Sequence, residues 1–168
     1  MYSNTAQDIG QFVKGKIAEL LFEMMMREDT SRTFTVIPFG YEKTTPELAQ
    51  YRELIKNYDT LEVIKRSPDY ILIKNDKTKV YFVEVKYRRR MSNINKRGLL
   101  ESSQKVSQHW KDTWYFVATQ DGFYFDSGKE VIKNNGKMMS LDEKIISPEI
   151  QKKYLAVLKE FIRVETKI

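Results

Sequence analysis

The stretch RSPDYILIKNDKTKVYFVEVKYRRR, residues 66–90, predicts the β-hairpin at the centre of the fold. Its second half is rich in β-branched and aromatic residues, which favour strands. The sequence NDKT, residues 75–78, is typical of a turn, because Asn and Asp side chains hydrogen-bond to their own backbone. We therefore expect two antiparallel strands in which Lys74 faces Lys79.

This hairpin brings three polar side chains onto an otherwise apolar sheet. In the register set by the turn, Asp69 faces Glu84, and Lys86 shares their face because side chains alternate along a strand. Like charges directly opposite each other destabilise a hairpin. A carboxylate pair withdrawn from water needs a cationic side chain or a metal ion nearby. The stretch therefore predicts a functional cluster, with an ordinary cross-strand ion pair as the alternative.

Composition limits the chemistry of any metal site. The chain has no cysteine and one histidine, His109, which excludes thiolate sites and zinc sites built from several histidines. Oxygen ligands remain, and these favour Mg²⁺, with Mn²⁺ able to substitute. Next to Trp110 near a predicted helix end, His109 itself is expected to be structural.

Length and charge indicate one domain with a polyanionic partner. A chain of 168 residues is expected to form a single domain, residues 1–168, with a core at about 5–126 and a C-terminal helix at about 147–165. The net charge is +6, and a basic run without acids follows Glu84. The candidate phosphate-binding residues in this run are Arg88, Arg89, Arg90, Lys96 and Arg97, with a solvated loop as the alternative.

No apolar segment approaches the roughly 18 residues of a membrane span, and the N-terminus lacks the layout of a signal peptide. We therefore expect a cytoplasmic protein that associates with nucleic acid and not with a membrane.

Hydrophobic periodicity predicts an α/β fold with a mixed β-sheet flanked by α-helices. Helices are expected at 5–27, 45–58, 99–111 and 147–165, strands at 32–39, 60–66, 113–119 and 123–125, and loops at 91–98 and 133–140. Thr5 is the expected cap of the first helix. The apolar residues expected to form its core stripe are Ile9, Phe12, Val13, Ile17, Leu20, Leu21 and Met24. Glu19 and Glu23 border that stripe, and solvated helix-face acids are the simplest interpretation of both.

Pro68-Asp69, followed fifteen positions after Asp69 by Glu84-Val85-Lys86, resembles the signature of the PD-(D/E)XK nuclease superfamily. The segment GKIAE, residues 15–19, is similar to the acidic motif that precedes the signature in that family. The resemblance covers about residues 5–120 and implies a restriction-endonuclease-like core. In such a core Glu19, Asp69 and Glu84 would be catalytic residues that hold the metal, and the catalytic Lys86 would lie near the attacking water. Gln104 and Lys105 are candidate auxiliary residues on the helix after the second strand, although the family's Gln-xxx-Tyr form is absent.

The resemblance implies a Mg²⁺-dependent DNA endonuclease, of the Holliday-junction-resolvase-like or the homing or restriction type. Many enzymes of this fold are dimers, so a homodimer is also implied. Two alternatives remain open: a non-catalytic nucleic-acid-binding domain of the same fold, and an RNA-processing nuclease.

Overall fold

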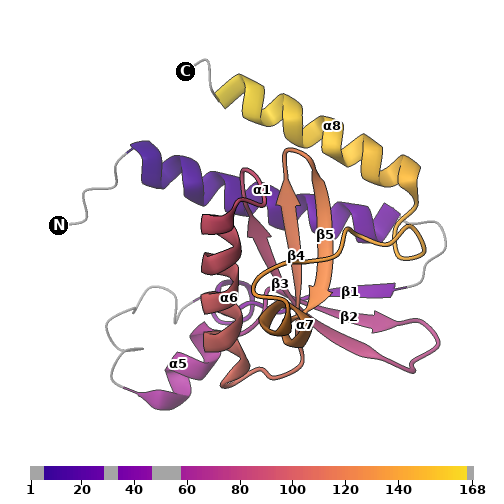
Figure 1. The fold of residues 1–168 in the computed structure, drawn as a ribbon. Helices are drawn as coiled ribbons and strands as arrows, with labels where there is room; N and C mark the ends of the chain where they lie inside the picture. The colour runs from indigo at the N-terminus through magenta and orange to yellow at the C-terminus, as the bar shows by residue number, and fades with distance from the viewer. Residues whose placement is uncertain (1–5, 29–33, 47–57, 166–168) are drawn as a thin grey trace.

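The computed structural model describes residues 6–28, 34–46 and 58–165 (Figure 1). The strands are β1 (Phe34–Pro38), β2 (Tyr70–Lys74), β3 (Val80–Tyr87), β4 (Thr113–Thr119) and β5 (Gly122–Ser127). The helices are α1 (Ala6–Glu28), α2 (Tyr41–Thr44), α5 (Asp59–Lys65), α6 (Asn93–Ser107), α7 (Gly128–Lys133) and α8 (Pro148–Glu165).

The strands form one mixed sheet in the order β1-β2-β3-β4-β5. Neighbouring strands are antiparallel except β3 and β4, which are parallel. A parallel pair needs a long crossover, and α6 supplies it between these two strands. The expected α/β class, with a mixed sheet flanked by helices, is confirmed.

The predicted hairpin register is confirmed. Tyr70 pairs with Val83, and Ile73 pairs with Val80. The Lys74 N–H donates to the Lys79 carbonyl at 2.9 Å and so closes the turn. Continued by one residue, the same ladder brings Asp69 opposite Glu84.

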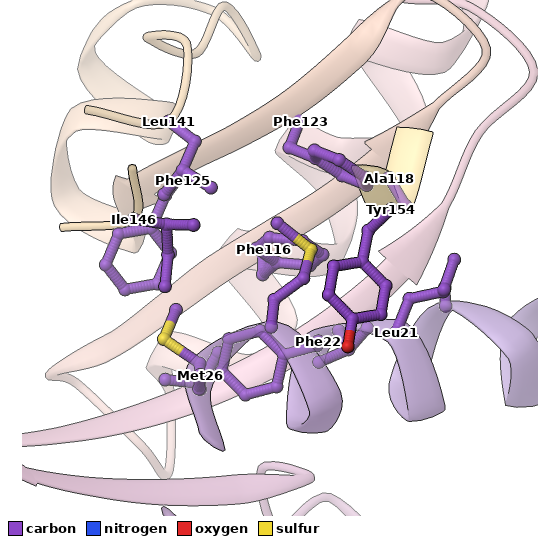
Figure 2. Packing of buried hydrophobic residues seen from close by; sticks show 14 of the residues in the cluster. Leu21, Phe22, Met26, Phe116, Ala118, Phe123, Phe125, Leu141, Ile146 and Tyr154 are labelled. Carbon is purple, nitrogen blue, oxygen red and sulfur yellow. The ribbon is translucent and has the colours of Figure 1, made fainter. Parts of the chain in front are cut away.

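Helices cover both faces of the sheet. Helices α1 and α8 pack on one face, where their apolar side chains meet those of β3, β4 and β5 (Figure 2). The labelled side chains of that core include Phe22 from α1, Phe116 from β4 and Tyr154 from α8. A second apolar cluster, Leu99, Tyr115, Val117 and Val131, lies on the opposite face under α6 and α7. Because Glu84 and Lys86 alternate with the core residues of β3, their side chains lie on the α6 face.

Helix α1 has the predicted position but not the predicted core stripe. Its fully buried residues are Ala18, Leu21, Phe22, Met25 and Met26, and Ile17 is partly buried against them. The expected core residues Ile9, Phe12, Val13, Leu20 and Met24 are 37–60% exposed. The prediction merged two apolar faces of one helix into a single arc, and the sheet packs against only one of them.

Three segments differ from the expected elements. The strand expected at 60–66 is absent, because residues 60–65 belong to helix α5. The expected loop 91–98 contains the first turn and a half of α6, because the Ser92 hydroxyl accepts a hydrogen bond from the Asn95 N–H and caps a helix there. Helix α7 was not predicted; it begins after Ser127, whose hydroxyl accepts from the Glu130 N–H.

Two predictions lie largely outside the described residues, namely the Thr5 cap and most of the helix at 45–58. Within the described part, Thr45 ends α2, since its N–H donates to the Tyr41 carbonyl. Among the described helices, none combines the length and the apolar character that a membrane crossing requires.

Gly136 tests the contact between α6 and the loop after α7. Its φ is +80°, and a Cβ there would lie 2.0 Å from the Lys96 carbonyl oxygen. We expect Gly136→Ala to destabilise the fold by about 1–3 kcal/mol or more, because it adds both backbone strain and a clash with backbone. Thermal unfolding followed by circular dichroism measures this as a fall in Tm of several degrees.

Gly15→Ala is the matched control, because a Cβ at this position in α1 meets nothing within 4 Å. This variant should gain about 0.5–1 kcal/mol from helix propensity. Equal Tm changes in the two variants would contradict the described packing at Gly136.

Candidate active site

A cleft of about 680 Å³ opens between α1 and α2 on one side and β3 and α6 on the other. The four residues predicted to form the site, Glu19, Asp69, Glu84 and Lys86, all line this cleft. They come from three separate parts of the chain: helix α1, the residue before β2, and strand β3. The fold therefore brings together the residues that the hairpin and the preceding helix predicted.

Backbone groups from two other segments, the turn after β1 and strand β3, hold Asp69 in place. Its carbonyl accepts hydrogen bonds from the N–H groups of Phe39 and Gly40, just after β1, at 2.9 and 3.1 Å. Its carboxylate Oδ2 accepts from the Val85 N–H of β3 at 2.8 Å. Since both the main chain and the side chain of Asp69 are bound, its carboxylate has a fixed position at the edge of the ladder.

The electrostatic surroundings of Asp69 oppose its ionisation. Burial and the negative charges of Glu84 and Glu19 raise the pKa of Asp69 to about 7. The hydrogen bond from Val85 and the charge of Lys86 act in the opposite direction but do not cancel these effects. The pKa of Asp69 is thus raised mainly by its removal from water and further by repulsion from the two neighbouring carboxylates.

Lysine side chains pair with the other two carboxylates. Lys86 Nζ donates to Glu84 Oε1. On α1 and α2, Lys16 Nζ lies 3.1 Å from Glu19 Oε1 and Lys43 Nζ lies 3.2 Å from Glu19 Oε2. Burial alone would lower the pKa of Lys86, but the charge of Glu84 and its hydrogen bond raise it above the usual value, so Lys86 is a cation at neutral pH.

The carboxylates have the right chemistry for a hard divalent cation, because Mg²⁺ and Mn²⁺ prefer oxygen ligands. In the described part of the chain, however, no group of three or more acidic or histidine side chains is arranged to hold a metal ion as it stands. In this arrangement lysine ammonium groups pair with oxygen atoms of Glu19 and Glu84. Metal binding at these residues would require the carboxylates to exchange their lysine partners for the cation.

Two residues beside Glu19 were missed at the level of sequence: Lys43 of α2, which lines the cleft, and Tyr70 of β2. The Lys43 ammonium lies 3.7 Å from the centroid of the Tyr70 ring. The Tyr70 hydroxyl donates to the Glu19 carbonyl and to Glu23 Oε2, both at 3.2 Å. Burial and the charges of Glu23 and Glu19 raise the pKa of Tyr70 far above its usual value, which keeps the hydroxyl a donor. No local pattern signals this contact, because Lys43 and Tyr70 are distant in sequence from Glu19.

Glu23 lies one turn beyond Glu19 but serves a different purpose. It accepts the Tyr70 hydroxyl and an ion pair from Arg27 at 2.9 Å. It is half-buried and does not line the cleft, so it supports the position of Tyr70 on the α1 side.

The cleft is basic overall. Among the described residues that line it, basic side chains outnumber acidic ones by seven to four. Besides Lys86, the basic ones are Lys16, Lys43, Lys65, Arg66, Arg88 and Lys105. Such a lining favours an anionic ligand with repeated charges.

The predicted basic run only partly reaches this lining. Arg88 lies in the cleft, where burial lowers its pKa and its guanidinium donates to the Tyr87 carbonyl. In the described structure Arg89, Arg90, Lys96 and Arg97 do not line the cleft. Arg97 pairs with Glu101 at 3.1 Å, and Arg90 lies 3.9 Å from Asp121.

Helix α6 presents Ser102 and Lys105 to the cleft, whereas Gln104 is exposed outside its lining. Ser102 was missed, and the three-residue spacing from Lys105 on one helix face was the available signal. His109 is exposed and also lies outside the lining, while its neighbour Trp110 packs between Phe39 and Phe82.

Asp69→Asn should stabilise the protein in a pH-dependent way. Folding raises the pKa of Asp69 from 3.8 to about 7, so the stabilisation from its proton is complete below pH 3.8 and is lost as the pH rises through about 7. Asparagine keeps an oxygen for the Val85 N–H but carries no charge. At pH 8 we therefore expect the variant to exceed the wild type by about 1–3 kcal/mol, a few degrees in Tm, with the gap closing towards pH 5.

Asp76→Asn is the control for this measurement. The hydrogen bond from Lys74 lowers the pKa of Asp76 to about 2, so its charge is constant between pH 5 and pH 8. A Tm difference for Asp69→Asn that is the same at both pH values would contradict the electrostatic account of the cluster.

Comparison with known proteins adds no family assignment. No protein-family model matches the chain, and no curated protein is significantly similar to it. The resemblance to the PD-(D/E)XK nucleases rests on Pro68-Asp69, on Glu84-Val85-Lys86 and on the segment 15–19.

Proposed function

We propose that this chain is a divalent-cation-dependent nuclease of the restriction-endonuclease-like fold that hydrolyses phosphodiester bonds in DNA. One observation carries the proposal: the buried Asp69 carboxylate is coupled electrostatically to Glu84 and Glu19 beside a protonated Lys86, in a basic cleft. The carboxylates offer oxygen ligands to a divalent cation, and the more numerous basic side chains of the same cleft favour a polyanion.

Glu19, Asp69 and Glu84 are the residues that would hold the cation, Mg²⁺ or Mn²⁺. A bound cation of this kind supplies a water of lowered pKa and draws charge from a phosphate oxygen. The protein fixes Asp69 through the Val85 N–H, and Glu84 projects from the same rigid strand. A site on strands is held more precisely than one on loops, which suits a reaction that depends on position.

Lys86 acts in this proposal as a charge stabiliser and a hydrogen-bond donor. Because its pKa is raised, it carries a proton at neutral pH and is not a general base. Its ammonium lies on the face of β3 that lines the cleft, next to Glu84. From there it would stabilise the negative charge that develops on the phosphate in the transition state, and would orient the attacking water.

The other cleft cations are assigned to the phosphates that flank the scissile bond. Arg88 extends from the end of β3, and Lys105 lies on α6. Contacts of this kind position a nucleic acid without reading its sequence. The homodimer implied by the resemblance stays a prediction, as does the junction-resolving or restriction subtype.

Asp69→Ala is expected to abolish cleavage in Mg²⁺, by a factor of at least about 10³, because it removes a proposed cation ligand, the carboxylate held by the Val85 N–H. Cleavage is measured on linear, nicked, branched and single-stranded DNA and on RNA of matched sequence. Circular dichroism verifies that the variant is folded. Lys129→Ala is the control, since Lys129 lies outside the cleft and pairs with Asp112.

Undiminished cleavage by Asp69→Ala would end the proposed mechanism. Salt-sensitive binding with no cleavage of any substrate in Mg²⁺ or Mn²⁺ would favour a non-catalytic nucleic-acid-binding domain. Faster cleavage of the RNA members of the panel would assign the enzyme to RNA processing.

A further inference from the structure

The α1–α2 wall of the cleft contains an ion-pair network whose two lysines differ in one respect. Glu19 is bound by both Lys16 and Lys43. Lys16 has a second acidic partner, Glu42, at 2.9 Å. Within the described residues, Glu19 is the only acid paired with Lys43.

Lys43 keeps its place through a contact that does not involve Glu19. Its ammonium lies 3.7 Å from the centroid of the Tyr70 ring, within the range of a cation–π interaction. Tyr70 in turn is held by its hydroxyl on Glu19 and Glu23 and by its pairing with Val83 in the sheet. The backbone that carries Lys43 is also tied to the site, because Gly40 donates to the Asp69 carbonyl and accepts from the Lys43 N–H at 2.8 Å.

Engagement of Glu19 by a divalent cation would therefore affect the two lysines differently. Lys16 would retain Glu42 as a counter-ion. Lys43 would lose the one acid with which it pairs in the described structure, and its ammonium would remain over Tyr70 in the cleft lining, where its side chain is 28% exposed. An ammonium in that setting is a strong site for a phosphate oxygen.

We propose that Lys43 is a phosphate-binding residue whose ammonium passes from Glu19 to the nucleic acid when a divalent cation takes over the Glu19 carboxylate. The exchange makes the cation and the nucleic acid bind cooperatively, because each removes the partner that competes with the other. The inference rests on the proposed function and adds an order to it: the cation prepares the α1–α2 wall for the phosphate backbone. By linkage, the factor by which the cation tightens nucleic-acid binding equals the factor by which the nucleic acid tightens cation binding.

Lys43→Met tests the exchange, because methionine keeps an unbranched side chain over Tyr70 and removes the charge. Binding of Mn²⁺ alone is followed by the electron paramagnetic resonance signal of the free ion. Binding of fluorescein-labelled DNA is followed by anisotropy with and without Mn²⁺. Every protein in these assays carries Lys86→Met to suppress cleavage, and the protein with that substitution alone is the parent. We expect Lys43→Met to bind Mn²⁺ alone more tightly than the parent does. The coupling factor, which is the factor by which Mn²⁺ tightens DNA binding, should be lower in Lys43→Met than in the parent by about fivefold or more.

Lys16→Met and Lys43→Arg are the matched controls. Lys16→Met removes one charge from the same carboxylate but leaves Lys43 in place, so the coupling factor should persist. Lys43→Arg restores the charge and should restore the coupling, which a purely structural role of the side chain would not predict. Circular dichroism and Tm establish that each variant is folded, and Lys43→Gln replaces Lys43→Met if the methionine variant is not.

The outcomes separate this inference from the proposed function. The exchange alone would be overturned by two results together. The parent would bind Mn²⁺, and Lys43→Met would weaken DNA binding equally in the presence and absence of Mn²⁺. Loss of coupling in Lys16→Met rather than in Lys43→Met would also overturn it. Absence of Mn²⁺ binding by both the wild type and the parent would contradict the proposed function and, with it, this inference.

Discussion

The constraint on which the site depends is the electrostatic repulsion around Asp69. A carboxylate that is buried beside two other acids is unfavourable in its ionised form, and its raised pKa expresses that cost. The fold tolerates the arrangement because the turn after β1 holds the Asp69 backbone, strand β3 holds its side chain, and lysines pair with its neighbours. The cluster therefore lowers the free energy of unfolding, while it keeps three carboxylates close together.

Lysine partners explain how such a cluster exists in a folded chain. Lys16 and Lys43 offset Glu19, and Lys86 offsets Glu84; both partners of each pair keep some solvent exposure, so the pairs can exchange with other ions. A deeply buried ion pair would hold its partners far more tightly. The partial exposure of the pairs is therefore as important to the proposed chemistry as the carboxylates themselves.

The hairpin was predictable because its information is local. Turn residues and strand propensity determined the register, and the register alone placed Asp69 opposite Glu84. Contacts between distant segments were not predictable in the same way: Lys43 reaches Tyr70 and Glu19 only through the tertiary fold. The stripe of α1 was misjudged for a related reason, since Leu20 and Met24 are as apolar as Leu21 and Met25, and only the sheet distinguishes the buried face. Residues 60–66 were assigned to a strand from a short apolar run, which periodicity does not separate from a helix of seven residues.

The attachment of Asp69 to two segments far apart in the sequence has a consequence for biosynthesis. Its partners Phe39 and Val85 are far apart along the chain, and Glu19 belongs to a helix near the N-terminus, so the cluster cannot assemble until the chain has been made at least as far as β3. Strand β4, which pairs with β3 in parallel, must then arrive through the α6 crossover to complete the sheet around it. Contacts of such long sequence separation form slowly and late in folding. A nascent or partly folded chain would accordingly lack the arrangement of charges described here, and any activity at this site would arise only in the finished protein.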